Sequence, residues 1–286
     1  MEKKLIIILV ALCVICSTGS AFGAVYQWFG ANGTGTPPPD RNWMNGENWR
    51  LEGTSTHGFV PTDQDRAKVN SVWNNPGPVI GGAFGTVSAV VGELFIAEGE
   101  TGYQDVTVGV GGTLTTGSPG GVPWLGQMNI GYSPGLTGGL VADGGTANIT
   151  QHLWLGWNGR GILQMNSGTV NVGQMFAPGA GTTFGGNPLN TGFGEVHLDG
   201  GLLHTQQWWG GAGFLGVHNY SFDITGGAWE IHGFWVNQIQ ELIDNGWITG
   251  GASVSWDPVN ELTVVIPEPI TLSLLGLGAL LLRRRS

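Results

Sequence analysis

The chain has 286 residues, of which 53 are glycine, and charged residues make up only 10% of it. Its formal net charge is −10, although five of its ten basic residues lie within the first four or the last four positions. The long segment between these ends is therefore strongly acidic, which excludes the basic footprint that nucleic-acid binding needs. The apolar content of 41% indicates a folded protein, and the many glycines favour short strands joined by tight turns.

Residues 1–23 have the three parts of a secretory signal peptide. A basic start and an apolar run occupy Lys3–Ile15, and small residues follow as far as Ala24. We favour cleavage after Gly23, which places Ala21 at the −3 position, and cleavage after Ala21 is the alternative. Both cysteines of the chain lie inside this segment. The mature protein is therefore expected to have no disulfide and no thiolate chemistry.

The last twenty or so residues also have three parts in order. They are the motif Pro267, Glu268 and Pro269, then the apolar segment Ile270–Leu282, then Arg283, Arg284 and Arg285. The apolar segment is shorter than the roughly 20 residues of a full membrane span. Positive charge directly after an apolar stretch marks the cytoplasmic side of a membrane. A buried C-terminal helix is the alternative, but three terminal arginines and the lack of polar patterning disfavour it.

This C-terminal arrangement resembles the PEP-CTERM sorting signal, and the resemblance covers residues 266–286. It implies recognition by an exosortase, a membrane protease-transferase, with the Pro-Glu-Pro motif as the recognition element. Members of this family tend to come from bacteria that make extracellular polysaccharide. The resemblance thus implies export to the cell surface or extracellular matrix, with transient anchoring in the inner membrane through the C-terminal segment. It leaves the activity of the body undefined.

The segment 24–86 is rich in Trp and Asn, and we expect it to form an N-terminal cap. It contains Asn-Trp pairs within Asn42–Trp49, then Val-Pro-Thr and an Asp within Val60–Asp65, shortly before Ala-x-Val. This order resembles the opening of autotransporter-like β-helix proteins. Because the open end of a solenoid must be covered, Trp43 and Trp49 are predicted to pack as a lid over the first rung. A sugar-stacking platform is the alternative for these two rings.

Residues 87–232 repeat a unit of about 22 residues, which is a length typical of solenoids. Met128–Ile149 aligns with Leu153–Val172, and looser copies begin near Val106, Gly194 and Ser221. The alignment pairs Gly131 with Gly156, Gly139 with Gly161, Gly145 with Gly168, and Thr-Ala-Asn-Ile with Thr-Val-Asn-Val. Two or three short strands in such a unit fit one coil of a parallel β-helix. A propeller blade would need about 40 residues and four strands.

In such a solenoid, inward apolar residues are buried only when the next coil stacks on them, at a spacing of about 4.8 Å. One inward ladder is predicted to hold Val141, Leu163, Val196 and Phe222. A second is predicted to hold Ala147, Val170, Leu202 and Ala228. The predicted C-terminal cap, 233–265, has a helix over Val236–Asn245 and two strands, Ala252–Trp256 and Glu261–Ile266. The fold prediction is an all-β parallel β-helix, capped at both ends and followed by a transmembrane sorting helix.

The sequence shows no convincing catalytic residues, and no cofactor is expected. Polar residues occupy equivalent positions before the repeat glycine, namely Asp143, Asn166, Asp199 and Thr225. We interpret them as turn residues that bond the local backbone rather than as calcium ligands or acid–base groups. The six histidines lack metal-ligand spacing. Residues 87–231 hold one basic residue, Arg160, which argues against a polysaccharide lyase. Glu195 and Asp199 could pair as glycosidase carboxylates, but their positions favour strand and turn roles.

Four tryptophans, Trp154, Trp157, Trp208 and Trp209, could form an aromatic stripe that stacks on carbohydrate, and core packing is the alternative. The leading functional prediction is an exported, non-catalytic structural or adhesive protein at the cell surface or in the matrix. An extracellular carbohydrate-binding module is the second hypothesis, and a polysaccharide-active enzyme is the third. The expected partners are an exosortase-type enzyme, the membrane and extracellular polysaccharide. Exposed aromatic rings on one face would favour binding, and converging carboxylates would favour an enzyme.

Overall fold

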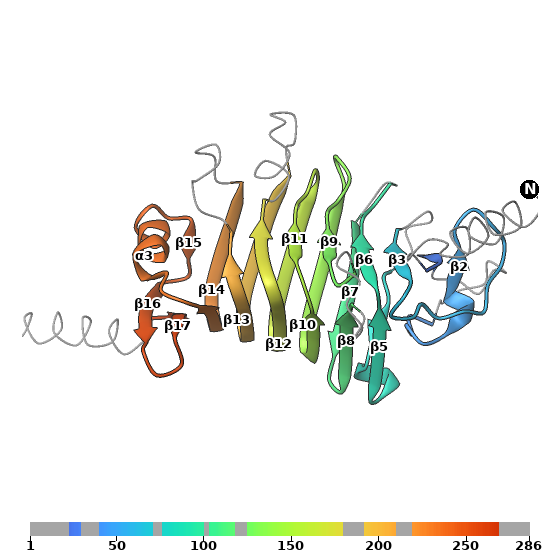
Figure 1. The fold of residues 1–286 in the computed structure, drawn as a ribbon, viewed down its shortest axis with the longest axis horizontal. Helices are drawn as coiled ribbons and strands as arrows, with labels where there is room; N and C mark the ends of the chain where they lie inside the picture. The colour runs from blue at the N-terminus through green and yellow to red at the C-terminus, as the bar shows by residue number, and fades with distance from the viewer. Residues whose placement is uncertain are drawn as a thin grey trace, which may run out of the picture.

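The computed structural model describes residues 23–29, 40–70, 76–99, 103–117, 125–179, 192–209 and 219–268. These residues are mostly β-strand, which confirms the predicted all-β class. Figure 1 shows most strands side by side along the longest axis of the molecule, with the single labelled helix, α3 (Val236–Asp244), beyond β14 (Tyr220–His232) and next to β15 (Ile248–Thr249) and β16 (Ala252–Asp257). Nearly all strand pairs are parallel, and partners are usually separated in the chain by other strands. They form three ladders, named A, B and C below.

Ladder A begins at the N-terminal side and consists of short strands. Its members are β1 (Val25–Trp28), β3 (Arg66–Val69), β6 (Glu93–Ile96), β9 (Met128–Ile130), β11 (Leu153–Leu155) and the last residues of β12 (Arg160–Pro178) and β13 (Phe193–Trp208). All of these neighbours are parallel. One further strand, β2 (Trp49–Leu51), pairs antiparallel with β1 and is preceded by the 3-10 turn η1 (Gly46–Asn48).

Ladders B and C are formed largely by two halves of the same long strands. Ladder B runs through β4 (Val79–Ile80), β7 (Tyr103–Gly109), the first halves of β10 (Thr137–Ile149), β12, β13 and β14 (Tyr220–His232), and β15 (Ile248–Thr249). Ladder C runs through β5 (Val87–Val91), β8 (Gly112–Thr116) and later parts of β10, β12, β13 and β14. The 3-10 turn η2 (Gly82–Phe84) lies between β4 and β5.

The repeat alignment is confirmed in ladder C but is shifted by one residue in ladder B. Thr146 to Ile149 pair with Thr169 to Val172, as predicted. In ladder B, however, Gly138 and not Gly139 pairs with Gly161. Because successive strand residues point to opposite faces, a shift of one residue exchanges inside and outside.

Both predicted inward ladders are corrected, the first by this shift and the second by a one-residue difference on β13 and β14 within ladder C. Leu140, and not Val141, is the fully buried residue in register with Leu163, and that ladder continues to Val196 and Phe222 as predicted. In the other ladder the buried members after Ala147 and Val170 are Leu203 and Trp229 rather than Leu202 and Ala228. Leu202 and Leu203 are both apolar, as are Ala228 and Trp229, so the sequence left the phase of the alternation undetermined.

The rings of Trp43 and Trp49 are fully buried, as a packed lid requires. They contact each other edge to face at 4.7 Å, and Trp49 Nε1 donates to the Trp43 carbonyl at 2.8 Å. Trp28 of β1 packs on Trp49 at 5.1 Å. Neither predicted lid ring offers a face to solvent, so the sugar-stacking alternative for this pair is excluded.

At the other end, helix α3 (Val236–Asp244) confirms the predicted helix, and Ile239 and Leu242 are its buried residues. The predicted strand pair that follows is also present, as β16 (Ala252–Asp257) antiparallel to β17 (Leu262–Pro267). β17 pairs antiparallel with the end of β14 as well, so a strand of opposite direction covers the last parallel strand of ladder C.

Of the described residues, none forms a helix long and apolar enough to cross a membrane. The predicted sorting helix, with Pro269 and Arg283, Arg284 and Arg285, lies outside the described residues, as do residues 1–22 of the predicted signal peptide. Of the predicted sorting motif, Pro267 ends β17 opposite Ala252, and the Glu268 N–H donates to the Gly251 carbonyl.

Candidate functional site

The outer face of ladder A holds aromatic, charged and amide side chains close together. Its strands turn Ala67, Leu94 and Met128 fully inward. The intervening residues form an outward row in direct register: Lys68, Phe95, Asn129 and Trp154. Because β-strand residues alternate between faces, this row is fixed by the same pairing that fixes the core.

A hollow of about 300 Å³ lies over this row and is walled on one side by aromatic rings. Tyr132 and Trp157 stack nearly parallel, with centroids 6.3 Å apart and planes inclined by 17°. Phe95 meets Tyr132 edge to face at 5.1 Å, and Trp154 meets Trp157 in the same way at 5.4 Å. The four rings thus form one continuous wall, of which Phe95 and Trp154 are the deeply buried members.

Tyr132 and Trp157 occupy equivalent places because each follows a glycine that turns the chain out of ladder A. Gly131 and Gly156 both have φ of 68°, in the left-handed region that favours glycine. The N–H of Gly131 bonds the Ile96 carbonyl, and that of Gly156 bonds the Ile130 carbonyl. The repeated turn therefore places one aromatic ring directly beside the next along the stack of strands.

Polar groups line the rest of the hollow. Asn129 belongs to β9 and Gln127 directly precedes it, and the Gln127 side-chain oxygen Oε1 accepts from Trp154 Nε1 at 2.9 Å. Arg66 donates through both Nε and Nη2 to Glu93 Oε2, at 3.0 and 2.7 Å. The guanidinium also lies 4.7 Å from the centre of the Phe95 ring, where a cation–π contact adds to the ion pair.

Each charged side chain in this region has an oppositely charged neighbour. Lys68 Nζ lies 2.9 Å from Glu52 Oε1 and 3.4 Å from Glu98 Oε2, and Glu98 lines the hollow. Burial raises the pKa of the Glu93 carboxyl, with a smaller contribution from the nearby charge of Glu98, while Arg66 opposes the shift. The hollow thus contains two carboxylates, each matched by a cation, beside a wall of aromatic rings.

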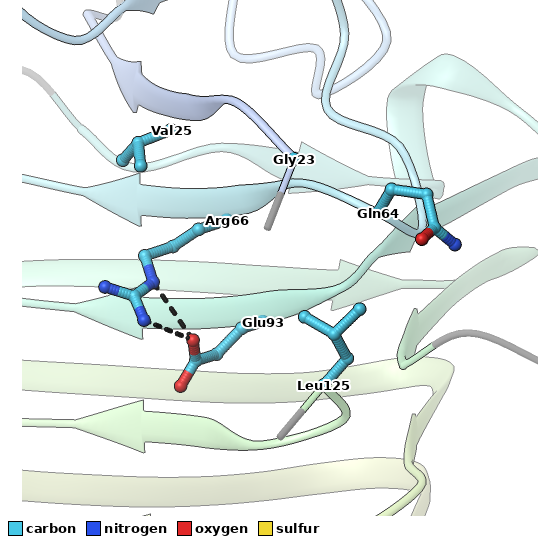
Figure 2. A pocket seen from close by; sticks show the side chains of 6 residues that line it. All are labelled: Gly23, Val25, Gln64, Arg66, Glu93 and Leu125. Atoms are coloured by element: carbon cyan, nitrogen blue, oxygen red, sulfur yellow. Dashed lines mark hydrogen bonds and ion pairs between the residues drawn. The ribbon is translucent and has the colours of Figure 1, made fainter. Parts of the chain in front are cut away.

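A second hollow of about 250 Å³ adjoins the first on the N-terminal side. Figure 2 shows the Arg66–Glu93 ion pair on its wall, with Gly23 and Val25 along one edge and Leu125 and Gln64 at the other end. The two hollows share Arg66 and Glu93, so the ion pair separates a polar and aromatic space from a more apolar one.

Three of the four tryptophans predicted to form a stripe gather on this outer face. Trp154, Trp157 and Trp209 pack around Ala177 and Met175 as one cluster outside the main core. Trp208 differs: it is 5% exposed and packs edge to face against Trp229 at 4.9 Å in the interior. Its ring belongs to the main core and does not line the hollow. Adjacent strand residues point to opposite faces, so the Trp208-Trp209 pair had to divide in this way.

Sequence reasoning missed most of the hollow. Arg66, Glu93, Phe95 and Tyr132 were not singled out, although the sequence contained a signal for one of them. The alignment that placed Gly131 on Gly156 also placed Tyr132 on Trp157, two aromatic residues at the same point of successive repeats. A recurring aromatic residue just after a turn glycine indicates a surface row, because the turn directs the following side chain away from the core.

Two of the four polar residues before the repeat glycine, Asp199 and Thr225, bond to each other across strands, which corrects the turn role predicted for them. Asp199 Oδ1 accepts from Thr225 Oγ1 at 2.6 Å, and its Oδ2 accepts from Gln164 Nε2 at 2.8 Å. The same Gln164 amide donates to Asn166 Oδ1 at 3.0 Å. The hydrogen bonds from Thr225 and Gln164 lower the pKa of Asp199. Asp143 is exposed on β10.

Glu195 and Asp199 do not form a glycosidase pair. They lie four residues apart on β13, a separation of roughly 13 Å along an extended strand, beyond the roughly 5–9.5 Å of paired glycosidase carboxylates. Arg160 holds Glu195 through two bonds of 2.7 Å, whereas Asp199 has the partners described above. Within the described ranges there is also no group of three or more His, Cys, Asp or Glu side chains placed to hold a metal ion.

No protein-family model, curated protein or solved structure matches this chain.

Proposed function

We propose that the chain is an exported parallel β-helix that binds an extracellular saccharide in the hollow on the outer face of ladder A. The β-helix part is supported by three parallel ladders that the chain joins in turn, with apolar residues buried at matching positions of each. The export part is supported by the signal-peptide pattern of residues 1–23 and by the resemblance of residues 266–286 to a sorting signal.

One observation supports saccharide binding above a purely structural role, namely the hollow itself. The partly exposed rings of Tyr132 and Trp157 offer apolar surface, and the buried rings of Phe95 and Trp154 pack behind them. The amides and carboxylates of the hollow offer hydrogen-bond partners for hydroxyl groups. Sugar rings have apolar faces and polar edges, so this mixture matches their chemistry. A volume of about 300 Å³ is at the lower end of ligand pockets, which suits one or two sugar units at a time.

The charge pattern favours a neutral saccharide. Each cation near the hollow already has a carboxylate partner, so an acidic sugar would have to displace Glu93 from Arg66 or the two glutamates from Lys68. The aromatic wall runs from strand to strand, along the stack, with a step of about 4.8 Å. A linear polysaccharide would therefore lie across the strands, with successive sugar units over successive strands.

Binding is tested by titrating the purified chain with soluble neutral and acidic polysaccharides in a calorimeter. Neutral polysaccharides should bind more tightly than acidic ones, and Trp157→Ala should weaken that binding at least tenfold because it removes one ring of the wall. Trp256→Ala is the matched control, since Trp256 is also partly buried but lies on β16 beside Phe234. Absence of binding to every polysaccharide, or equal losses in the two variants, would leave only the structural or adhesive role.

Hydrolysis of the bound saccharide is a second candidate, favoured by the two carboxylates that share the hollow. Glu93 has a raised pKa, as a general acid needs, and Glu98 is close enough for its charge to act on it. The ion pairs of both groups with Arg66 and Lys68 favour binding over catalysis. Release of new reducing ends from a neutral polysaccharide, lost in Glu98→Gln, would establish hydrolysis.

A further inference from the structure

The Asp65 carboxylate lies at the start of ladder A and holds the first residues of the described chain. Only 8% of Asp65 is exposed. Its Oδ1 accepts from the Ala24 N–H at 2.8 Å, and its Oδ2 accepts from the Thr62 N–H at 2.9 Å and from Thr62 Oγ1 at 2.7 Å. Across the described part of the chain, no lysine or arginine lies within ion-pair distance of Asp65.

A nearly buried carboxylate without a positive partner is costly, because hydrogen bonds from neutral groups only partly replace water. The atom that faces Oδ1 is a backbone nitrogen, and in an uncut chain this nitrogen is a neutral amide with one hydrogen. If the chain began at Ala24, the same nitrogen would be an α-ammonium with three hydrogens and a full positive charge. Asp65 would then have a counter-ion at a distance that the fold already sets.

The residues around Ala24 show how closely this position is held. The Arg66 N–H donates to the Ala24 carbonyl at 3.0 Å, and β1 begins at the next residue in parallel register with β3. Gly23 lies against the backbone of Gln64, where an added Cβ would be 2.2 Å from the Gln64 carbonyl oxygen. Figure 2 shows Gly23 at the rim of the adjoining hollow, near the chain that leads through Gln64 into Arg66.

We propose that the export protease cuts the bond between Gly23 and Ala24, and that the new α-ammonium of Ala24 forms an ion pair with Asp65. In this step water hydrolyses the peptide bond, Gly23 leaves as a carboxylate, and the amine released on Ala24 takes up a proton. Cleavage after Ala21 would instead leave a neutral amide at Ala24 and Asp65 without a counter-ion. The inference rests on the export part of the proposed function and is independent of saccharide binding.

Mass spectrometry of the N-terminus of the exported chain gives the first test. A chain that begins at Ala24 is the expected result. A chain that begins at Phe22 would overturn the inference while export stands. An intact N-terminus at Met1 on a chain that is found inside the cell would overturn the export proposal, and the inference with it.

The ion pair is tested on two purified proteins, one beginning at Ala24 and one at Phe22. Asp65→Asn should lower the folding equilibrium constant of both chains, and the loss should be roughly fivefold to tenfold larger in the chain that begins at Ala24. Only that chain loses an ion pair, and a hydrogen bond between charged groups contributes more than one from a neutral amide. Asp143→Asn, at an exposed carboxylate, should affect both equally. If Asp65→Asn prevents folding, acetylating the α-amine of the Ala24 chain provides the alternative, and an unchanged urea midpoint after acetylation would overturn the ion pair.

Discussion

The direction of two neighbouring side chains in β10 gives a stringent test of the register of ladder B. Leu140 is fully buried, and its partners in the adjacent strands, Val106 and Leu163, are fully buried as well. Strands on both sides and a filled interior leave little freedom for the site to collapse. Leu140→Ala should therefore cost about 3 kcal/mol of the free energy of unfolding, the middle of the range for buried leucines.

The next residue along the strand is the matched control. Val141 is partly exposed and lies between Thr107 and Gln164 on the outer face. Truncation there removes two methyl groups that are partly in water, so Val141→Ala should cost less than about 1 kcal/mol. The register that the sequence alone favoured, with Val141 inside, predicts the opposite order of the two losses.

Urea unfolding followed by circular dichroism measures both free energies, provided that the dependence on denaturant is the same for each variant. A loss in Val141→Ala equal to or larger than that in Leu140→Ala would refute the register. The test is sensitive because the two residues are neighbours in one strand and differ chiefly in the face to which the side chain points.

Two further predictions concern a turn glycine and the buried glutamate. Gly156→Ala should cost more than about 2 kcal/mol of the free energy of unfolding, because an added Cβ would lie 2.2 Å from the backbone of Phe193. Gly135 has a similar positive φ but open space around it, so Gly135→Ala should cost only the roughly 1–2 kcal/mol of the left-handed conformation. The urea midpoints of the two variants test this difference. Burial raises the pKa of Glu93, so its contribution to stability is largest when it is protonated and is lost as pH rises through the folded pKa. Thermal unfolding between pH 4 and pH 7 should therefore show Glu93→Gln gaining relative to the unaltered chain as pH rises, and a constant difference would contradict this assignment.

The sequence was sufficient for the period of the repeat but not for its phase everywhere. Thr146–Ile149 and Thr169–Val172 alternate polar and apolar residues without ambiguity, so their predicted pairing was right. At Leu202-Leu203 two apolar residues are adjacent, and either could point inward. In the structure Leu203 points inward, because it pairs with Val170 on the neighbouring strand, which is itself fully buried in the core.

The hollow was harder to predict because its residues are brought together only by pairing across several strands. Arg66 and Glu93 are 27 positions apart, and their ion pair exists because β3 and β6 pair with those two residues opposite each other. No local pattern around either residue indicates this. The aromatic wall is different, since Tyr132 and Trp157 recur at one point of the repeat, and that part was within reach of the sequence.

The location of the hollow follows from how the three ladders use their outward side chains. On ladder C, Asn171 Nδ2 donates to Asn148 Oδ1 at 2.8 Å, and on ladder B the Arg160–Glu195 pair joins neighbouring strands. There, polar side chains on the long strands form hydrogen bonds to one another across the strands. In ladder A the three-residue strands β9 and β11 are each followed by a turn glycine, and those turns place Tyr132 and Trp157 beside the outward row. The hollow, with aromatic rings on one side and amides and carboxylates on the other, lies over these short strands. The same feature that weakens the sheet locally therefore creates the binding site that we propose.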